Sequence, residues 1–421
     1  MNDFLLKSVQ IIHRNSPFHQ QIKHVALKDG KITAIAETHE SIEAREVIDC
    51  KNACLSVGWF DMRAVVPEIG CEYKEDLSSA SQAASAGGFT EVALLPVGNP
   101  PTQTKEAVAF LLRQSEKYLN TFYPIAATSM DTKGEEMTEM IDLHTAGAVA
   151  FSDGVLPTTN SSLIVKVLQY LAQFDGLFIN MPDEKNLSKF GLMHEGINST
   201  LLGMKGFPSL AEEMGVIRDL KLLSYVGGKI HFANLSCAEV VQLVREAKQK
   251  GMNVTASIAA HQLAFTDADL KDFDTNLKVK PPFRTQADIE ALQMGLLDRT
   301  IDAIVSDHQP QDEESKKLEF DMAEFGMIAL ETAFATANTF SNLPLEVLIE
   351  KFTTAPRQIL KIKQPEITVG EEANLTLFSS EQAWKYEFKN IRSKSKNSPF
   401  IDKTLKGKPL AVFNKGKSWI A

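Results

Sequence analysis

The feature that most constrains this chain is an alternation of short apolar segments with amphipathic helical patterns between residues 56 and 355. The apolar segments are rich in β-branched and aromatic residues, as in strands buried on both faces of a parallel sheet. We expect such strands at 91–95, 148–151, 177–179, 229–232, 254–257 and 303–305. A typical helical pattern runs from Ala238 to Lys250 and stops at Gly251, a residue type that often follows a helix. The alternation predicts an α/β fold with a (β/α)8 TIM-type barrel, and a doubly wound sheet is the alternative.

The first 55 residues lack this alternation and have the pattern of short strands. Two apolar runs, at 25–27 and 31–35, flank the dipeptide Asp29-Gly30. An Asp-Gly pair between two such runs is a strong signal for a tight β-hairpin. The N-terminal segment is therefore predicted to be a strand-rich unit.

Strand patterns return after the helical region, at 374–378 and 409–413. A barrel flanked by strands at both ends predicts that the two ends pair. We therefore expect a small β-sandwich domain built from 1–55 and 356–421, attached to a barrel that covers 56–355.

Composition excludes several classes of function. The net charge of −10 and the lack of a basic stripe argue against nucleic-acid binding. No apolar run approaches the ~18 residues of a membrane span, and the N-terminus lacks the pattern of a signal peptide. The four cysteines show no disulfide framework, so we expect structural thiols and a cytoplasmic protein. We also expect a homo-oligomer.

Ordered sequence matches over nearly the whole chain resemble dihydroorotase, a member of the amidohydrolase superfamily. The segment GWFDM resembles the family's G-F-I-D-M opening of the first barrel strand, and DAIVSDHQP resembles D-A-I-A-T-D-H-A-P. Further matches follow the family's order along the chain. They lie at 74–76, 86–90, 148–153, 279–284, 325–332, 373–378 and 395–400.

The resemblance implies a metal centre, usually zinc, that activates water and polarises the carbonyl of a cyclic amide. The two histidines of the family's H-x-H motif fall on Arg63 and Val65. Two further histidine ligands fall on Asn180 and Asn234. Because these replacements leave too few donors for zinc, we expect no metal and no other cofactor.

Residues at the family's substrate-binding positions are also replaced. An asparagine of the family aligns with Val97, another aligns with Lys280, and a histidine aligns with Gln311. Phe325 and Gly326 match the loop that lines the substrate in the family. We include all five in the predicted pocket, together with Arg63, Asn180 and Asn234.

Two carboxylates remain: Asp153 at the position of the bridging ligand and Asp307 at that of the general acid/base. Buried carboxylates left without a partner are costly, or they take up a proton. We therefore hypothesise that Arg63 and Lys280 replace the metals as cations and neutralise Asp153 and Asp307.

Four other polar residues have more ordinary interpretations. His308, His231 and His261 fall in family-like segments, but we expect structural roles for them. Asp61 is expected to brace the first barrel strand.

These replacements favour a non-catalytic dihydroorotase homologue that takes part in de novo pyrimidine biosynthesis. Some bacteria pair such a chain with aspartate transcarbamoylase, and the resemblance implies this partner here. The alternative is an active dihydroorotase, or another cyclic amidohydrolase, with a remodelled, metal-poor site in which Asp153 and Asp307 do acid/base work. A small-molecule sensor is a third reading of the residual pocket.

Overall fold

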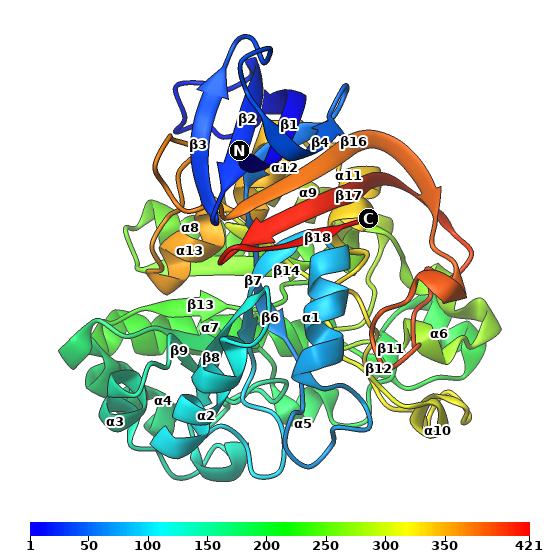
Figure 1. The fold of residues 1–421 in the computed structure, drawn as a ribbon. Coiled ribbons are helices and arrows are strands. Elements are labelled where there is room, and N and C mark those ends of the chain that lie inside the picture. Colours follow the sequence, from blue (N-terminus) through cyan, green and yellow to red (C-terminus); the bar gives the residue numbers. More distant parts are fainter.

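A barrel of eight parallel strands forms the centre of the computed structural model, which describes all residues from 1 to 421. The strands are hydrogen-bonded to one another in chain order, and helices lie outside them (Figure 1). They are β6 (Trp59–Ala64), β7 (Phe89–Leu94), β8 (Thr121–Ala127), β9 (Ala150–Ser152), β10 (Phe178–Asn180), β13 (Ile230–Phe232), β14 (Val254–Ala259) and β15 (Ala303–Val305).

The first and last strands meet and close the barrel. Ala64 forms a parallel bridge with His308, and the Val65 backbone N–H donates to the His308 carbonyl at 2.8 Å. The Asp61 carboxylate accepts from the backbone N–H of Ser306 at 2.9 Å and also from its hydroxyl, so this side chain ties β6 to the end of β15. A doubly wound sheet has two open edges, so closure rejects that alternative. The predicted barrel and the bracing role of Asp61 are confirmed.

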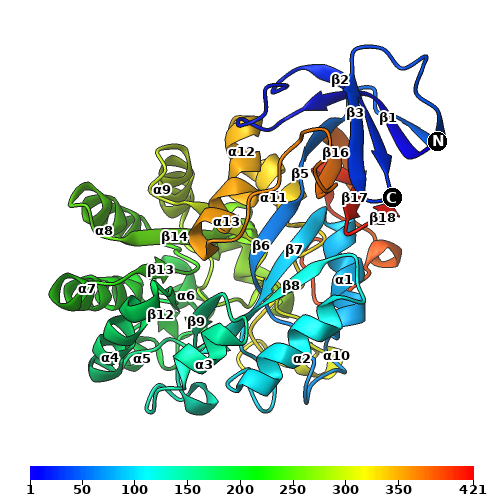
Figure 2. The ribbon, with the colours of Figure 1, turned by 60° about the vertical axis from the view of Figure 1, so that its left-hand side comes forward.

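Helices between successive strands form the outer ring, which Figure 2 shows most clearly. The predicted helix at 238–250 is present as α8, with Val240, Val241 and Val244 buried. The longer helices are α1 (Leu77–Ala86), α2 (Lys105–Ser115), α4 (Ser161–Leu171), α7 (Ser209–Val226), α8 (Ala238–Gln249), α9 (Gln286–Leu297), α11 (Ala333–Phe340) and α12 (Leu345–Phe352). Shorter ones are α3 (Met140–Thr145), α5 (Lys185–Ser188), α6 (Ile197–Leu202), α10 (Glu313–Lys316) and α13 (Thr354–Leu360).

One barrel strand, β8, was not anticipated. It begins with a half-buried Thr121 and carries Pro124, a residue type that usually counts against a central strand. The proline lacks an N–H, but its carbonyl still accepts from the Val149 backbone N–H at 3.0 Å. The strand therefore stays in the sheet because tertiary pairing outweighs the local signal.

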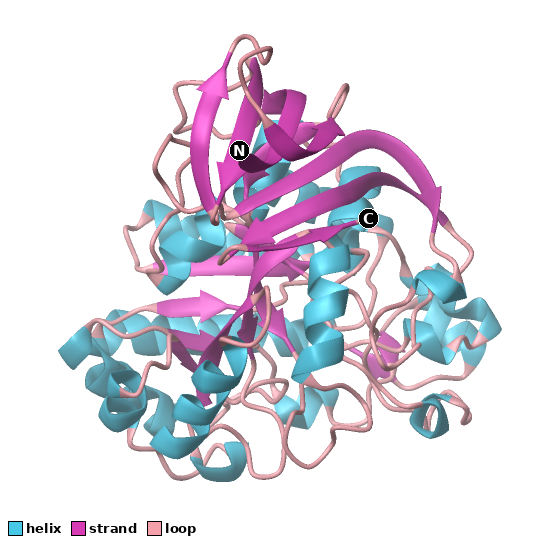
Figure 3. Ribbon diagram, in the orientation of Figure 1, coloured by secondary structure: helices cyan, strands magenta, loops and turns pink.

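The strands of the two chain ends form one eight-stranded sheet, which confirms the predicted β-rich domain built from both ends, and Figure 3 shows them gathered above the barrel. Lys28 pairs with Lys31 across the Asp29-Gly30 turn, which confirms the hairpin. Leu55 near the end of the N-terminal segment pairs with Leu377 of the C-terminal segment, so the two ends are hydrogen-bonded to each other. The strands are β1 (Asn2–Ile11), β2 (Ile22–Lys28), β3 (Lys31–Ala36), β4 (Ala44–Asp49), β5 (Cys54–Val57), β16 (Leu375–Lys385), β17 (Thr404–Asn414) and β18 (Lys417–Ile420).

Two separate apolar cores position the mouth of the barrel. Alternate strand residues, among them Phe60, Ile125, Ile179 and Val305, fill the barrel interior. A larger core lies between the strands and the outer helices. Because side chains fill the interior of the barrel, a ligand of the barrel binds at the rim formed by the carboxyl ends of the strands. None of the helices combines the length and the apolar character that a membrane span requires.

Candidate functional site

The polar residues singled out in the sequence meet at the carboxyl ends of the barrel strands. Arg63 lies near the end of β6, and Asp153 follows β9 directly. Asn180 ends β10, while Asn234 and Asp307 lie two residues beyond β13 and β15. All five side chains are buried. Enzymes with a (β/α)8 barrel carry their catalytic residues at this rim. The five residues therefore occupy the position of an active site in such a barrel.

The centre of the mouth holds an ion pair between Arg63 and Asp307. The guanidinium Nε donates to Asp307 Oδ1 at 2.8 Å, and both side chains are almost fully buried. The amide of Gln309 donates to both oxygens of the same carboxylate, at 3.0 and 3.1 Å. The Arg63 terminal nitrogens lie 3.4 Å from the Gly154 carbonyl. The predicted neutralisation of Asp307 by Arg63 is thus confirmed, and Asp307 has few lone pairs left to offer.

The second half of that hypothesis, which assigned a cation to Asp153, is wrong. Asp153 accepts from the Ser129 backbone N–H, the Ser129 hydroxyl and the Thr158 hydroxyl, each at 2.8 Å. Burial raises the pKa of this carboxyl above its ordinary value, and the three hydrogen bonds act against that rise. Neutral donors, in place of a cation, therefore satisfy Asp153.

Lys280 instead pairs with Asp183, whose carboxylate the sequence reasoning overlooked. The ammonium Nζ lies 2.9 Å from Asp183 Oδ2, and the carboxylate is buried while the lysine is half-exposed. Asp183 comes three residues after β10, which places its carboxylate at the rim beside Lys280. Its position shortly after the predicted strand at 177–179 was the available signal.

The two asparagines that replace histidine ligands have different surroundings. Asn180 is fully engaged: its carbonyl oxygen accepts from the Thr158 N–H at 3.0 Å, and its amide donates to Asp219 at 2.7 Å. Neither amide atom of Asn234 has a hydrogen-bond partner within the protein. Asn234 has a φ of 56°, a conformation that asparagine tolerates well. Its side chain lines a cavity of about 10 Å³ beside Lys280.

The remaining predicted pocket residues hold loops together around the mouth. Gln311 accepts from Lys74 Nζ at 2.7 Å and donates to the Phe325 carbonyl at 2.8 Å. Gly326 packs so closely on Gln309 that a Cβ would lie 2.7 Å from the Gln309 Cβ. Gln311, Phe325 and Gly326 therefore support the residue that covers Asp307.

Valines occupy two positions where the family has polar groups. Val97 lines a groove of about 490 Å³ at the rim, which also reaches Asp153. Val65 is partly buried and packs against the apolar interior of the barrel. Neither can ligate a metal.

The three histidines have structural surroundings. His308 lies between Glu75, at 3.3 Å from its Nε2, and the Ala329 backbone N–H, which donates to its Nδ1. Each ring nitrogen of His231 lies 2.9 Å from a hydroxyl of neighbouring β14, and the neutral ring donates one of these hydrogen bonds and accepts the other; burial lowers its pKa to about 3. His261 is buried with Nδ1 unpaired, and burial lowers its pKa to about 4. The structural interpretation fits His308 and His231 best.

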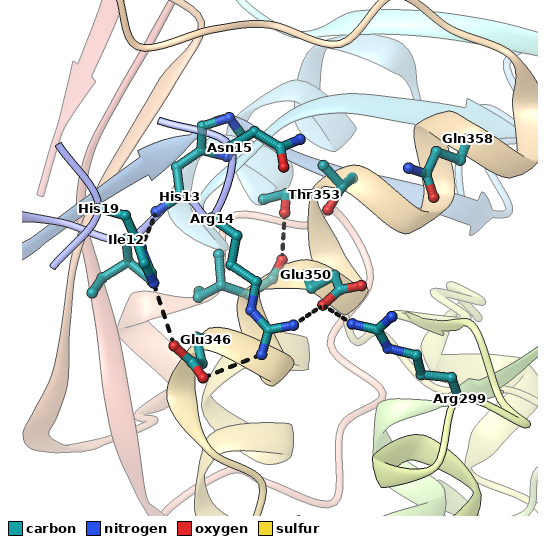
Figure 4. Close-up of a pocket in the computed structure, with 12 residues that line it drawn as sticks. Ile12, His13, Arg14, Asn15, His19, Arg299, Glu346, Glu350, Thr353 and Gln358 are labelled. Carbon is teal, nitrogen blue, oxygen red and sulfur yellow. Dashed lines mark hydrogen bonds and ion pairs between the residues drawn. The ribbon is translucent and has the colours of Figure 1, made fainter. Parts of the chain in front are cut away.

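A second cavity, of about 240 Å³, lies between the β-domain and the barrel (Figure 4). Arg14 reaches across it and pairs with Glu346 and Glu350, and Arg299 also contacts Glu350. The opposite charges in this cavity largely cancel. The sequence gives no spacing signal for it, because its residues come from three distant segments.

Relatives with known names match along almost the full length of the chain. A dihydroorotase from Syntrophus aciditrophicus is 38% identical over 418 residues, which cover 98% of each chain. One from Pelotomaculum thermopropionicum is 38% identical over 94% of this chain and 93% of its own. The chain belongs to the dihydroorotase family. In agreement, the family described as dihydro-orotase-like matches residues 54–240.

Solved structures of hydantoinases and dihydropyrimidinases share the fold. The L-hydantoinase (dihydropyrimidinase) of Arthrobacter aurescens superposes with a TM-score of 0.86 at 21% identity, over 99% of this chain and 96% of its own. The dihydropyrimidinase of Brevibacillus agri gives 0.83 at 17% identity, over 100% and 95%. These values show that the chain shares the fold of a barrel with a β-rich domain from the two termini.

The donor set at the mouth does not fit the zinc centre that the dihydroorotase family implies. Zinc requires three or four nitrogen, sulfur or carboxylate ligands, and no group of three His, Cys, Asp or Glu side chains converges anywhere in the structure. Asp307 is bound to a guanidinium and Asp153 to two hydroxyls and an amide. A dication beside Asp307 would also face the Arg63 charge.

Proposed function

We propose that this dihydroorotase-family chain acts in de novo pyrimidine biosynthesis as a non-catalytic protein that supports aspartate transcarbamoylase. The observation that carries the proposal is the buried contact between Arg63 and Asp307. Selection on an interface preserves a scaffold while the residues of the site are free to change. The family fold is retained over the whole chain, whereas the groups that perform the chemistry are not.

The proposed loss of activity follows from the proton transfer that ring opening requires. Hydrolysis of a cyclic amide needs an activated water, a polarised carbonyl and a group that moves a proton to the leaving nitrogen. To carry that proton, Asp307 needs a carboxylate lone pair that is free to bind it. Arg63 and Gln309 already donate hydrogen bonds to this carboxylate, so its lone pairs are largely occupied. Asp153, the other carboxylate that the family resemblance marks, already accepts hydrogen bonds from the Ser129 backbone N–H and from the hydroxyls of Ser129 and Thr158.

The first experiment measures dihydroorotate turnover and bound metal on protein purified without chelator. We expect no turnover with or without added zinc, and substoichiometric zinc. The matched variant carries Arg63→His, Val65→His, Asn180→His and Asn234→His, which restores the donors at the four ligand positions. Zinc uptake by this variant alone supports the proposal, while turnover or stoichiometric zinc in the unmodified chain contradicts it.

The second experiment tests the partner. Purified chain and aspartate transcarbamoylase from the same cell are mixed and separated by gel filtration. We expect one co-eluting complex, and a change in the assembly or activity of the transcarbamoylase. Two independent peaks at micromolar concentration would refute this partnership without bearing on the chemistry of the mouth.

A further inference from the structure

The cavity between the β-domain and the barrel has a polar lining with unused hydrogen-bonding groups (Figure 4). Of its twelve lining residues, two are hydrophobic, Ile12 and Ile349. The exposed side-chain amides of Asn15 and Gln358 form no hydrogen bond within the chain. His13 also lines the cavity, where it is 6% exposed and its ring has no hydrogen-bond partner. Because a side chain buried to this extent is normally paired, its free ring indicates room for a polar ligand.

The charged groups of the cavity are unequally engaged. Arg14 is held by two carboxylates: Nη1 lies 2.9 Å from Glu350 Oε2, and Nη2 lies 3.2 Å from Glu346 Oε1. Glu346 is engaged through both of its oxygens. Arg299 has a single contact, from Nη2 to Glu350 Oε2 at 3.4 Å, and its side chain is 65% exposed. Glu350 Oε1 accepts no hydrogen bond (Figure 4). One cation and one anion with free capacity therefore lie side by side.

We propose that this cavity binds a small polar α-amino acid, with its carboxylate on Arg299 and its ammonium on Glu350 Oε1. An α-amino acid carries both charged groups on one carbon atom, which matches a guanidinium and a carboxylate that already touch each other. A guanidinium binds a carboxylate through charge-assisted hydrogen bonds. An anion without an ammonium would face Glu346 and Glu350, and a cation without a carboxylate would face Arg14 and Arg299. A zwitterion satisfies both signs of charge.

The rest of the lining selects the side chain of that amino acid. The cavity of about 240 Å³ is smaller than the roughly 300–1,000 Å³ of pockets that hold drug-sized ligands, so its occupant is small. The two amides and the imidazole offer donors and acceptors, and the two isoleucines make little apolar wall. A side chain with a hydroxyl or an amide therefore fits better than a large apolar one.

The cavity lies between two parts of the fold and away from the mouth. Arg14 belongs to the loop between β1 and β2, whereas Glu350 lies on α12. A ligand bound to both parts should raise the stability of the chain, since it binds the folded state alone. Arg299 precedes β15, and the mouth lies beyond the opposite end of that strand. The inference thus goes beyond the proposed function and does not depend on it.

Calorimetric titration of the purified full chain tests the class of ligand. Serine, asparagine and glutamine are the probes, and at least one of them is expected to give saturable binding to one site. Its N-acetyl and carboxamide derivatives, which each lack one charge, should bind at least about tenfold more weakly. No binding of any probe up to about 10 mM would overturn the proposal. Tighter binding of leucine, of inorganic phosphate or of a derivative that lacks one charge would do the same.

Two variants test the assigned contacts. Arg299→Met removes the group for the carboxylate and is expected to weaken binding of the amino acid at least about tenfold. Glu350→Gln keeps the shape of the side chain and should weaken the amino acid but not its N-acetyl derivative, which has no ammonium. The matched control is Arg113→Met on α2, an exposed arginine outside the cavity, which should bind as the unmodified chain does.

The thermal unfolding midpoint gives an independent readout of the same contacts. A saturating amino acid should raise the midpoint of the unmodified chain and of Arg113→Met, and leave that of Arg299→Met unchanged. Binding that survives Arg299→Met, or that is lost equally in Arg113→Met, would refute the assignment of the ligand to this cavity.

Discussion

At the scale of single residues, internal ion pairs and hydrogen bonds hold the charged groups of the mouth. Arg63 and Asp307 are each nearly inaccessible to solvent, so each stabilises a charge that would otherwise be buried alone. Such a pair contributes little net stability over apolar residues of the same size, but loss of one partner is costly. The stability of the protein should therefore fall when one member of the pair is replaced, and fall less when both members are replaced together.

Arg63→Met is expected to lower the free energy of unfolding by about 3 kcal/mol, because Asp307 keeps only the Gln309 amide. Arg63→Met combined with Asp307→Asn should recover a large part of that loss. Urea denaturation measures both. Arg299→Met serves as the control, since this exposed partner of Glu350 should cost less than about 1 kcal/mol. Equal losses of unfolding free energy for Arg63→Met and Arg299→Met would show that breaking the buried pair costs no more than breaking an exposed one.

The lowered pKa of His231 predicts how the stability of the protein depends on pH. Burial lowers its pKa to about 3 from the ordinary 6.5, so the unfolded chain binds a proton between these values and the folded chain does not. Stability from this group is therefore complete above pH 6.5 and falls as the pH drops toward 3. By pH 4 the loss is on the order of 3 kcal/mol.

His231→Gln should remove this part of the pH dependence, leaving a packing cost that is the same at all pH values. The difference in unfolding free energy between the two proteins, measured from pH 8 to pH 4, is therefore expected to shrink as the pH falls. A constant difference over that range would mean that His231 does not titrate as described.

At the scale of elements, the conformation of the loop after β15 determines how Asp307 is covered. Gln309 covers Asp307, and Gly326 approaches Gln309 within a distance that leaves no room for a side chain. The backbone of Gly326 has a φ of 119°, which L-residues rarely adopt. The loop conformation and the covering of Asp307 are thus coupled.

Gly326→Ala should destabilise the protein by at least about 2 kcal/mol more than Gly134→Ala, a matched glycine with positive φ and no atoms within 4 Å of the added carbon. Thermal or urea unfolding of both variants gives the comparison. Equal costs would indicate that the contact with Gln309 relaxes freely.

At the scale of the whole molecule, the β-domain and the barrel share an aromatic junction. Trp59 of β6 lies 4.3 Å from Phe334 of α11, between ring centroids, and 5.1 Å from Phe378 of β16. It also neighbours Phe352 of α12. Because one buried side chain packs on both parts, neither part can unfold without exposing the core of the other.

We therefore expect a single cooperative unfolding transition. In a Trp384→Phe, Trp419→Phe variant the fluorescence reports Trp59 alone, and its midpoint in urea should coincide with that of the circular dichroism signal. Two separated midpoints would show that the β-domain and the barrel unfold independently.

The sequence alone was sufficient for the barrel and the β-domain of the two termini, because apolar periodicity and ordered motifs are local properties. Strand β8 escaped it, since Pro124 is an unfavourable local signal that pairing on both sides overrides. Only the tertiary structure decided that Lys280 pairs with Asp183 and that Gln309 covers Asp307. Ion pairs depend on distances between strand ends, and those distances follow from barrel closure.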